Sequence, residues 1–246
     1  IDPSLVFDEG KVYYLGNCRP YPDTDSTARH IWLQELELST GRLIGERHTL
    51  LTGGAMMNAS APEGPHIYHI GDYYYLLIAE GGTSHYHSST IFRSRSLTGP
   101  YEGNPRNPLI THRNLRWDYP IHSTGHADMI QLANGEWWAV LLASRPVGGD
   151  YRTLGRETFC IPVRWEDDWP VFCPDTGRVE MCYQAPGLPA YPWPERPVCC
   201  QFESDRLGAE WVTVRTPRRK FYSLTERAGY LRLYPGPETM REINHS

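Results

Sequence analysis

Three ionisable side chains recur at one position of a repeated sequence pattern. In each case an aromatic residue follows eleven positions later, and the pairs are Asp2 with Tyr13, Glu63 with Tyr74, and His126 with Trp137. If equivalent strands of the repeats meet at a common axis, two carboxylic acids and one imidazole share a central pocket. Groups of this kind give protons to reacting atoms and take protons from them, which is general acid–base chemistry.

A β-hairpin with one plan surrounds each of these residues. Each segment has a polar start, a short apolar strand, a glycine-containing turn, an aromatic pair and a second apolar strand. The turn glycines are Gly10, Gly71 and Gly135, so the repeats are spaced by 61 and 64 residues. A period near sixty with several short strands per period predicts a β-propeller with one blade per repeat. Glu63 then opens a strand at the mouth of the channel, unless it only caps a turn or pairs with an arginine at the rim.

The composition favours an all-β protein. The chain has 246 residues, with 16 tyrosines, 8 tryptophans, 22 glycines and 21 prolines, and many turns together with many aromatics are typical of β folds. Its formal net charge of −5 argues against nucleic acid or an anionic membrane as the main partner. No apolar run approaches the roughly 18 residues that a membrane helix requires. The six cysteines show no metal-ligand spacing.

The composition changes near residue 183. The segment YQAPGLPAYPWPERP, residues 183–197, contains five prolines, which predicts an extended linker. We therefore expect a partial propeller over residues 1–182, a proline-rich linker over 183–199, and a second β unit over 200–246. The last region is too short for a β-sandwich with its own core.

Five motifs, in order along the chain, resemble glycoside hydrolase family 43. They are IDPSLVFDEGKVYY, APEGPHIYHIGDYYYLLIAEGGT, TGPYEGNPRNPLIT, GHADMIQLANGEWWAVLLASRP and LGRETFCIPVRW. The chain looks most like the β-xylosidase and α-L-arabinofuranosidase branch, over essentially its whole length. The resemblance implies a five-bladed propeller with about three blades present, and an inverting glycosidase. It also makes residues 1–182 the catalytic domain and residues 200–246 the first strands of a C-terminal β-sandwich domain.

The resemblance implies a role for each candidate site residue. Glu63 in EGPH matches the general acid, and Asp2 in IDPS matches an aspartate that tunes the pKa of that acid and orients it. His126 in GHAD matches a histidine near the pocket floor that is sometimes associated with a water-bound metal ion. No cofactor is required, although a structural calcium near His126 stays open. Arg156 in LGRET matches an arginine that contacts sugar hydroxyls, and Thr83 at the end of AEGGT matches a pocket-lining position.

Ordinary structural explanations stand beside these roles. Arg156 can form an ion pair with Glu157 or Asp167, and a lone histidine at a strand start is often a satisfied structural group. Several aromatic residues can stack on sugar rings or simply pack, namely Tyr86, Trp117, Tyr119 and Trp193. His85 and His87 flank Tyr86 in a segment that looks like a loop over the pocket, but this spacing alone is a weak metal signal.

The general base of the family has no counterpart in these residues. The resemblance places it in a Pro-Asp-Pro-Ser-like motif well upstream of IDPS. We therefore expect a fragment that lacks the N-terminal blades and most of the sandwich. Losing the base should lower turnover by orders of magnitude, so residues 1–246 alone should be nearly inactive.

The expected substrate is an oligosaccharide or an aryl pentoside that contains xylose or arabinose. The alternatives are a non-catalytic carbohydrate-binding propeller, an inactive fragment, and a propeller that binds other proteins. Blade faces without partners promote association, so a homo-oligomer is one expectation for this chain. The sequence leaves open whether the protein is secreted or cytoplasmic.

Overall fold

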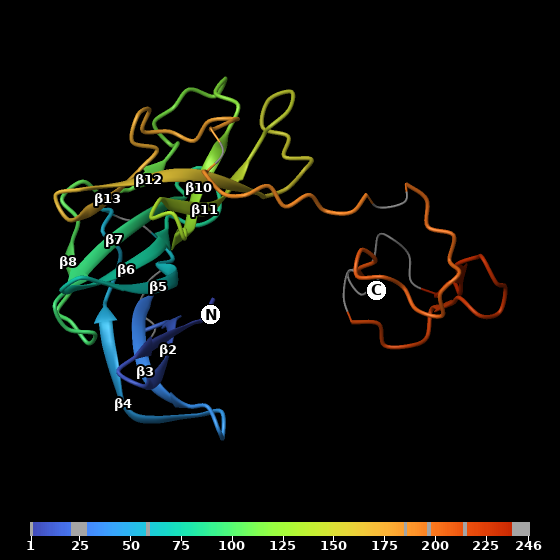
Figure 1. Ribbon diagram of the computed structural model, residues 1–246, viewed down its shortest axis with the longest axis horizontal. Helices are drawn as coiled ribbons and strands as arrows, with labels where there is room; N and C mark the ends of the chain where they lie inside the picture. The colour runs from blue at the N-terminus through green and yellow to red at the C-terminus, as the bar shows by residue number, and fades with distance from the viewer. Residues whose placement is uncertain are drawn as a thin grey trace. The chain divides into compact units, whose positions relative to one another are not determined.

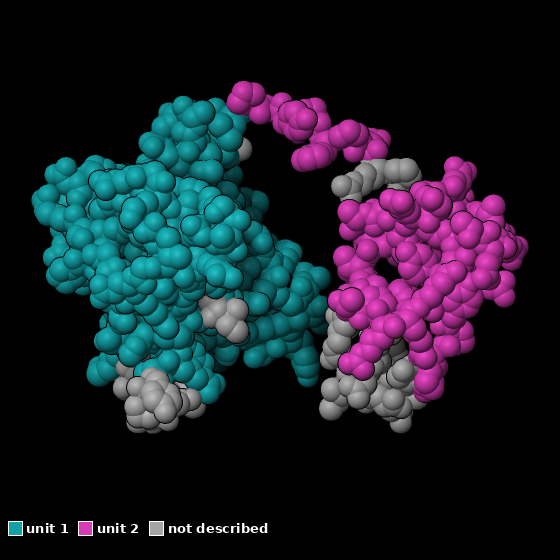
Figure 2. Space-filling view, turned by 90° about the horizontal axis from the view of Figure 1, so that it is seen from below, with its two compact units in different colours: residues 1–188 teal, residues 189–246 magenta. Residues whose placement is uncertain are grey.

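The computed structural model (Figure 1) describes residues 2–20, 29–57, 60–184, 186–195, 198–213 and 216–237. These residues contain fifteen strands and no helix. A membrane-spanning helix is accordingly not found in this part of the chain. The chain divides into two compact units, residues 1–188 and residues 189–246 (Figure 2), and each is described by itself.

The first unit consists of three antiparallel sheets that follow one another along the chain (Figure 1). The first sheet has the strands β1 (Ser4–Asp8), β2 (Lys11–Cys18), β3 (His30–Glu37) and β4 (Arg42–Leu51). The second has β5 (Glu63–Ile70), β6 (Tyr73–Glu80), β7 (Ser88–Ser94) and β8 (Glu102–Gly103), with β9 (Ile110–Thr111) paired to β7. The third has β10 (His122–Gln131), β11 (Trp137–Ser144), β12 (Glu157–Glu166) and β13 (Trp169–Phe172).

Within each sheet the strands lie side by side in chain order. An antiparallel meander of four strands is the unit of a propeller blade. The predicted all-β fold with about three propeller blades is therefore confirmed. The predicted hairpins form at the expected turns, for example at Glu9 and Gly10, which join β1 to β2. Both residues have positive φ, 47° and 78°, as a two-residue type I′ turn requires.

The second sheet is buried on both faces. Leu76 and Ile78 of β6 belong to one apolar core shared with the first sheet, which supplies Leu15 and Leu33. Their neighbour Leu77 belongs to a separate core shared with the third sheet. This explains why β6 reads as a continuous apolar run rather than as an alternating pattern.

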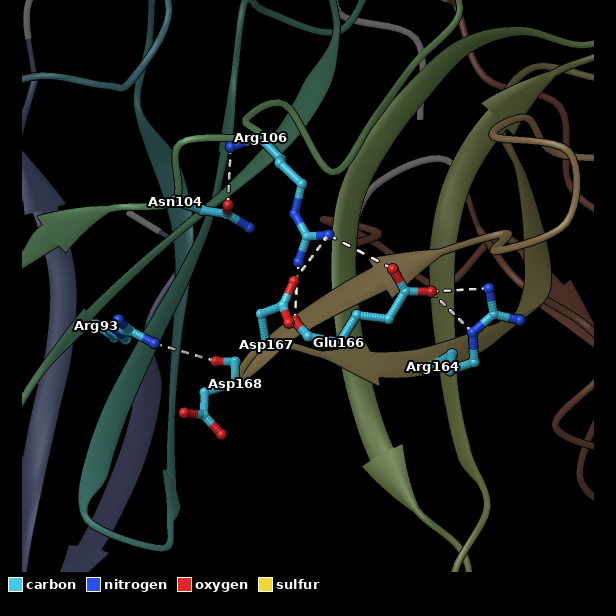
Figure 3. A network of polar contacts seen from close by, with 7 residues as sticks. All are labelled: Arg93, Asn104, Arg106, Arg164, Glu166, Asp167 and Asp168. Atoms are coloured by element: carbon cyan, nitrogen blue, oxygen red, sulfur yellow. Dashed lines mark hydrogen bonds and ion pairs between the residues drawn. The ribbon is translucent and has the colours of Figure 1, made fainter.

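Polar contacts also join the second and third sheets, at the turn between β12 and β13 (Figure 3). Arg106 donates to the carbonyl oxygen of Glu166 at 2.8 Å, and the carboxylate of Glu166 pairs with Arg164 at 2.7 Å. Tyr75, from inside β6, donates its hydroxyl to the carbonyl oxygen of Asp168 at 2.7 Å. Exposed ion pairs stabilise a fold only slightly, and the Arg164–Glu166 pair lies within β12, so the bonds from Arg106 and Tyr75 are the ones that link the two sheets.

The second unit contains little regular structure among its described residues. Its strands are β14 (Tyr222–Ser223) and β15 (Arg232–Leu233), which form a two-stranded sheet. The proline-rich segment spans the division between the two units at residues 188 and 189. The boundaries expected at residues 182 and 199 remain predictions.

Candidate active site

The structure brings Asp2, Glu63 and His126 together. One carboxylate oxygen or ring nitrogen of each residue lies within 4.8 Å of those of the other two. Asp2 precedes β1, Glu63 is the first residue of β5, and His126 lies within β10. Each sheet thus contributes one residue from its first strand or from the segment just before it. Asp2 is exposed, and Glu63 and His126 are half-buried.

The three residues reach this place through different backbone geometry. Asp2 and His126 have positive φ values of 52° and 55°. Strand pairing shifts register between Glu63 and His66 in β5, and again between Gly125 and Asp128 in β10. Each of the three residues lies eleven positions before its aromatic residue, but they do not occupy equivalent positions in the strand pairing. Bulges, which re-aim side chains, make up the difference.

Gly64 provides the space that the ring of His126 occupies. A Cβ atom built at position 64 would overlap the Nε2 atom of His126, and Gly64 itself has a φ of +54°. The other ring nitrogen of His126, Nδ1, is buried and makes no hydrogen bond within the described part of the chain. The absence of a side chain at Gly64, the residue after Glu63, thus lets the ring of His126 pack against the start of β5.

A second histidine, His87, lies near His126. Its Nδ1 atom is 2.9 Å from the carbonyl oxygen of Ser123, and because a carbonyl only accepts, this nitrogen carries the proton. Burial lowers the pKa of His87 to about 4. This value includes smaller lowering effects from the charges of His126 and Arg156, and the bond to Ser123 opposes the decrease. His87 is therefore neutral at neutral pH, and Arg156 lies near enough to act on it.

Arg156 is exposed and immediately precedes β12. The acidic residues considered as its partners contact other arginines. Glu157 accepts three hydrogen bonds from Arg145, at 3.2, 2.9 and 2.5 Å, and Asp167 lies 4.0 Å from Arg106. Glu157 and Asp167 thus pair with Arg145 and Arg106 and not with Arg156. The role of Arg156 in contacting sugar hydroxyls stays a prediction.

Thr83 is exposed in the loop between β6 and β7. That loop contacts the segment that precedes Glu63, because the amide of Gly81 donates to the carbonyl oxygen of Ser60 at 2.8 Å. Ser60 lies three residues before Glu63 in the chain. Thr83 therefore projects from the same end of the second sheet as the general-acid candidate.

The sequence analysis missed Glu80, the last residue of β6. Its carboxylate is fully buried and accepts hydrogen bonds from the amides of Ala55 and Met56, at 2.9 and 3.1 Å, and from the hydroxyl of Thr90. Glu80 thereby holds the segment that leads into Glu63. The sequence signal that could have identified Glu80 is its place at the end of an apolar run. A carboxylate buried there needs hydrogen-bond partners.

The aromatic candidates separate into two groups. Tyr86 and Trp117 are each 64% exposed, and Trp117 stacks on His85 with ring centres 4.8 Å apart. Tyr119 donates its hydroxyl to the carbonyl oxygen of Val179 at 2.7 Å, which is a packing role. Trp193 belongs to the second unit. Of these four candidates, only Tyr86 and Trp117 lie exposed on loops of the first unit.

The ligand atoms of the three residues decide whether the site suits calcium. Asp2, Glu63 and His126 offer two carboxylates and one imidazole. Calcium takes six to eight oxygen ligands and seldom a nitrogen. The residues that the structure describes here do not fit a directly bound calcium, and no catalytic step is assigned to one.

Most glycoside-cleaving enzymes use paired carboxylic acids, and the site contains two carboxylates close together, those of Asp2 and Glu63. Family comparison gives the same class. Residues 1–170 match glycosyl hydrolases family 43, and residues 199–246 match a β-xylosidase C-terminal concanavalin A-like domain. The chain therefore belongs to glycosyl hydrolase family 43.

Individual relatives agree with this assignment. Over 95% of its length, the chain is 44% identical to the non-reducing end α-L-arabinofuranosidase BoGH43B of Bacteroides ovatus, covering 42% of that protein. It is also 44% identical to a xylosidase/arabinosidase of Butyrivibrio fibrisolvens, over 100% of the chain and 48% of the relative. The chain thus spans less than half the length of these curated relatives.

Solved structures give the same picture. The structure of GH43B from the Bacteroides ovatus xyloglucan locus aligns with a TM-score of 0.82 and 43% identity, over 95% of this chain and 44% of that one. A xylan β-1,4-xylosidase from Bacillus halodurans C-125 aligns with a TM-score of 0.85 and 35% identity, over 95% and 44% of the two chains.

Proposed function

We propose that the protein is a glycosidase that releases xylose or arabinose from oligosaccharides by an inverting acid–base mechanism. The observation that carries this proposal is the meeting of Asp2, Glu63 and His126 within 4.8 Å, from three successive sheets. The names of the relatives, which are α-L-arabinofuranosidase and xylosidase/arabinosidase, support the substrate class.

Glu63 acts as the general acid that protonates the leaving oxygen of the glycosidic bond. The family resemblance places beside this acid an aspartate that tunes and orients it. Asp2 lies in that position, because its carboxylate and that of Glu63 approach within 4.8 Å. Asp2 also orients the acid, as the family resemblance implies.

The same distance argues against Asp2 as the general base. In an inverting glycosidase the two catalytic carboxyl groups stand about 6.5–9.5 Å apart, because a water molecule must fit between the base and the sugar. Asp2 is too close to Glu63 to leave that room. We assign the base to a residue outside residues 1–246, because the family resemblance places it in a motif upstream of IDPS.

The remaining residues bind the substrate. Arg156 presents a planar guanidinium whose donors suit neighbouring hydroxyl groups. His126, which packs against Gly64, is assigned to the floor of the pocket and Thr83 to its lining, as the family resemblance implies. None of these groups needs a cofactor to act.

Activity of the full-length protein on two substrates tests the proposal. The protein should release pentose from an aryl β-xyloside or an aryl α-L-arabinofuranoside, and Glu63→Ala should abolish that release. NMR of the first-formed sugar should show the anomer opposite to that of the substrate. No release from either substrate, or a retained anomer, would contradict the proposal.

A non-catalytic carbohydrate-binding protein is the second candidate. The observation that favours it is the lack of a base at inverting distance among the residues assigned to the site. It predicts that the full-length protein binds xylo- or arabino-oligosaccharides in calorimetry without hydrolysing them. Hydrolysis that depends on Glu63 would exclude it.

A further inference from the structure

β10 is distorted at the residues that carry His126. Ser123 and His126 have φ values of 56° and 55°, and both are residues with a Cβ atom. Pairing with β11 shifts register twice here, between His122 and Gly125 and between Gly125 and Asp128. Such strained backbone persists only where the surrounding structure holds it in place. The ladder with β11 cannot do so, because it is interrupted at this point.

Two side chains of the second sheet hold the distorted segment instead. His87, just before β7, donates from Nδ1 to the carbonyl oxygen of Ser123 at 2.9 Å. Ser89 accepts a hydrogen bond at Oγ from the amide of Ala127 at 3.1 Å. The two bonds fix the backbone on either side of His126. Both side chains are buried, His87 with 1% exposed and Ser89 with none.

The ring of His87 also supports the segment by contact. It lies against Gly125, where a Cβ atom would come within 2.6 Å of the ring. The ring centres of His87 and His126 are 6.4 Å apart. His87 therefore touches the backbone that carries His126, while its burial keeps it away from any substrate.

We propose that His87 and Ser89 are positioning residues that hold the bulge of β10 so that the imidazole of His126 faces Asp2 and Glu63. The catalytic consequence rests on the proposed function, whereas the placement of His126 does not. One requirement is specific. Position 87 must supply a hydrogen-bond donor to Ser123, and a side chain of the right size without a donor is not enough.

Two variants with side chains of nearly equal shape separate the effect of the hydrogen-bond donor at position 87 from the effect of side-chain volume. An asparagine amide can place its N–H group close to where Nδ1 of histidine lies, and leucine has nearly the same shape without a donor. The Nε2 atom of His87 makes no hydrogen bond among the described residues, so asparagine gives up no bond at that end. We therefore compare His87→Asn with His87→Leu in the full-length protein.

His87→Asn should keep kcat within about threefold of the wild type. His87→Leu should lower kcat about 100-fold, the size expected for a displacement of about 1 Å at a reacting site. Ser89→Ala should also lower kcat. Ser94→Ala is the control, because it removes a buried hydroxyl of the same strand that bonds to the amide of Ser96, away from β10.

A second measurement does not depend on activity. With ¹⁵N-labelled histidine and alanine, His87→Leu should shift the ring signals of His126 and the amide signal of Ala127, whereas His87→Asn should leave them near their wild-type positions. If the wild type has no glycosidase activity, this comparison still decides the placement. If His87→Leu does not fold, Ser89→Ala should still shift the Ala127 amide.

Two results would overturn the proposal. The first is that the asparagine and leucine variants lose activity equally, with equal signals for His126. The second is that the leucine variant, or Ser89→Ala in its place, leaves both kcat and the signals of His126 and Ala127 unchanged. Either result would mean that the donor at position 87 and the acceptor at position 89 do not place His126.

Discussion

Gly64 of β5 and His126 of β10 compete for one space, since a side-chain carbon at position 64 would overlap the Nε2 atom of His126. Gly64→Ala should therefore push the imidazole away from Glu63 and lower kcat by about 100-fold. The left-handed φ of Gly64 should add a stability cost of about 1–3 kcal/mol. Kinetics and thermal melting of the purified variant measure the two effects separately.

Gly71→Ala is a matched control for this variant. Gly71 has a φ of +59°, close to the +54° of Gly64, but nothing lies within 4 Å of a Cβ atom built there. It should lose stability and keep kcat. Equal losses of kcat in the two variants would show that backbone strain alone, and not the overlap with His126, is responsible.

Glu63→Gln should lower kcat by about 10² to 10⁴ on natural oligosaccharides, which is the contribution expected of a general acid. The loss should be smaller on a nitrophenyl glycoside, because its leaving group needs little protonation. Glu46→Gln, at an exposed site on β4, serves as the control and should change neither value. Equal losses on both types of substrate would argue that Glu63 binds substrate instead of donating a proton.

Arg156→Lys should raise KM by about tenfold and change kcat less. Lysine keeps the charge but loses the planar pair of donors that matches neighbouring hydroxyls. Arg116→Lys is the control, because that side chain is exposed and pairs with Asp118. Wild-type kinetics in Arg156→Lys would remove Arg156 from the binding site.

His87 should make the protein less stable in acid. Its pKa in the folded protein is about 4, against an ordinary value of 6.5, so between these values the unfolded chain binds a proton that the folded chain does not. Stability is therefore greatest above pH 6.5 and falls as the pH drops toward 4, by at most about 3 kcal/mol from this group. Burial also lowers the pKa values of His66 and His112, in the same direction.

Urea unfolding at pH 7 and pH 5 measures this effect. His87→Asn has no titrating group at position 87, so it should lose less stability on acidification than the wild type. Ser94→Ala, which removes no titrating group, should keep the wild-type dependence on pH. Parallel stability curves for the wild type and His87→Asn would contradict the assignment.

Residues 1–246 expressed alone should associate or be poorly soluble. On the first sheet Leu5 and Phe7 are 47% and 70% exposed, and on the third sheet Ile130 and Val140 are 57% and 42% exposed. Apolar faces of this kind promote association. Phe7→Ser together with Ile130→Ser should shift the mass measured by light scattering toward the monomer. A monodisperse, cooperatively melting wild-type monomer would contradict this.

The fold was largely predictable because its signals are local. Glycine turns such as Gly71 and short apolar strands such as Tyr73–Glu80 mark each hairpin within about twenty residues. The sheet order then follows from hairpins joined in sequence. The number of sheets in the first unit was predicted from the same turns.

The site was predictable only in part. The repeat aligned Asp2, Glu63 and His126, but the sequence cannot show that a bulge brings His126 into place. That bulge depends on His87, which lies 36 residues before Ser123 in the chain. The partners of Glu80 are similarly remote, at Ala55 and Met56. Contacts of this kind leave no periodic trace in the sequence.

No single sheet contains two of the three candidate residues, so the site exists only while the sheets keep their alignment. Tyr68 of β5 shows how that alignment is held, because its hydroxyl bonds to the carboxylate of Asp128 and accepts from the amide of Met129 in β10. A slight tilt between neighbouring sheets would move the three residues apart while every strand stayed paired. Loss of function on heating should therefore come before melting, and engineering for heat resistance belongs at such bridging contacts.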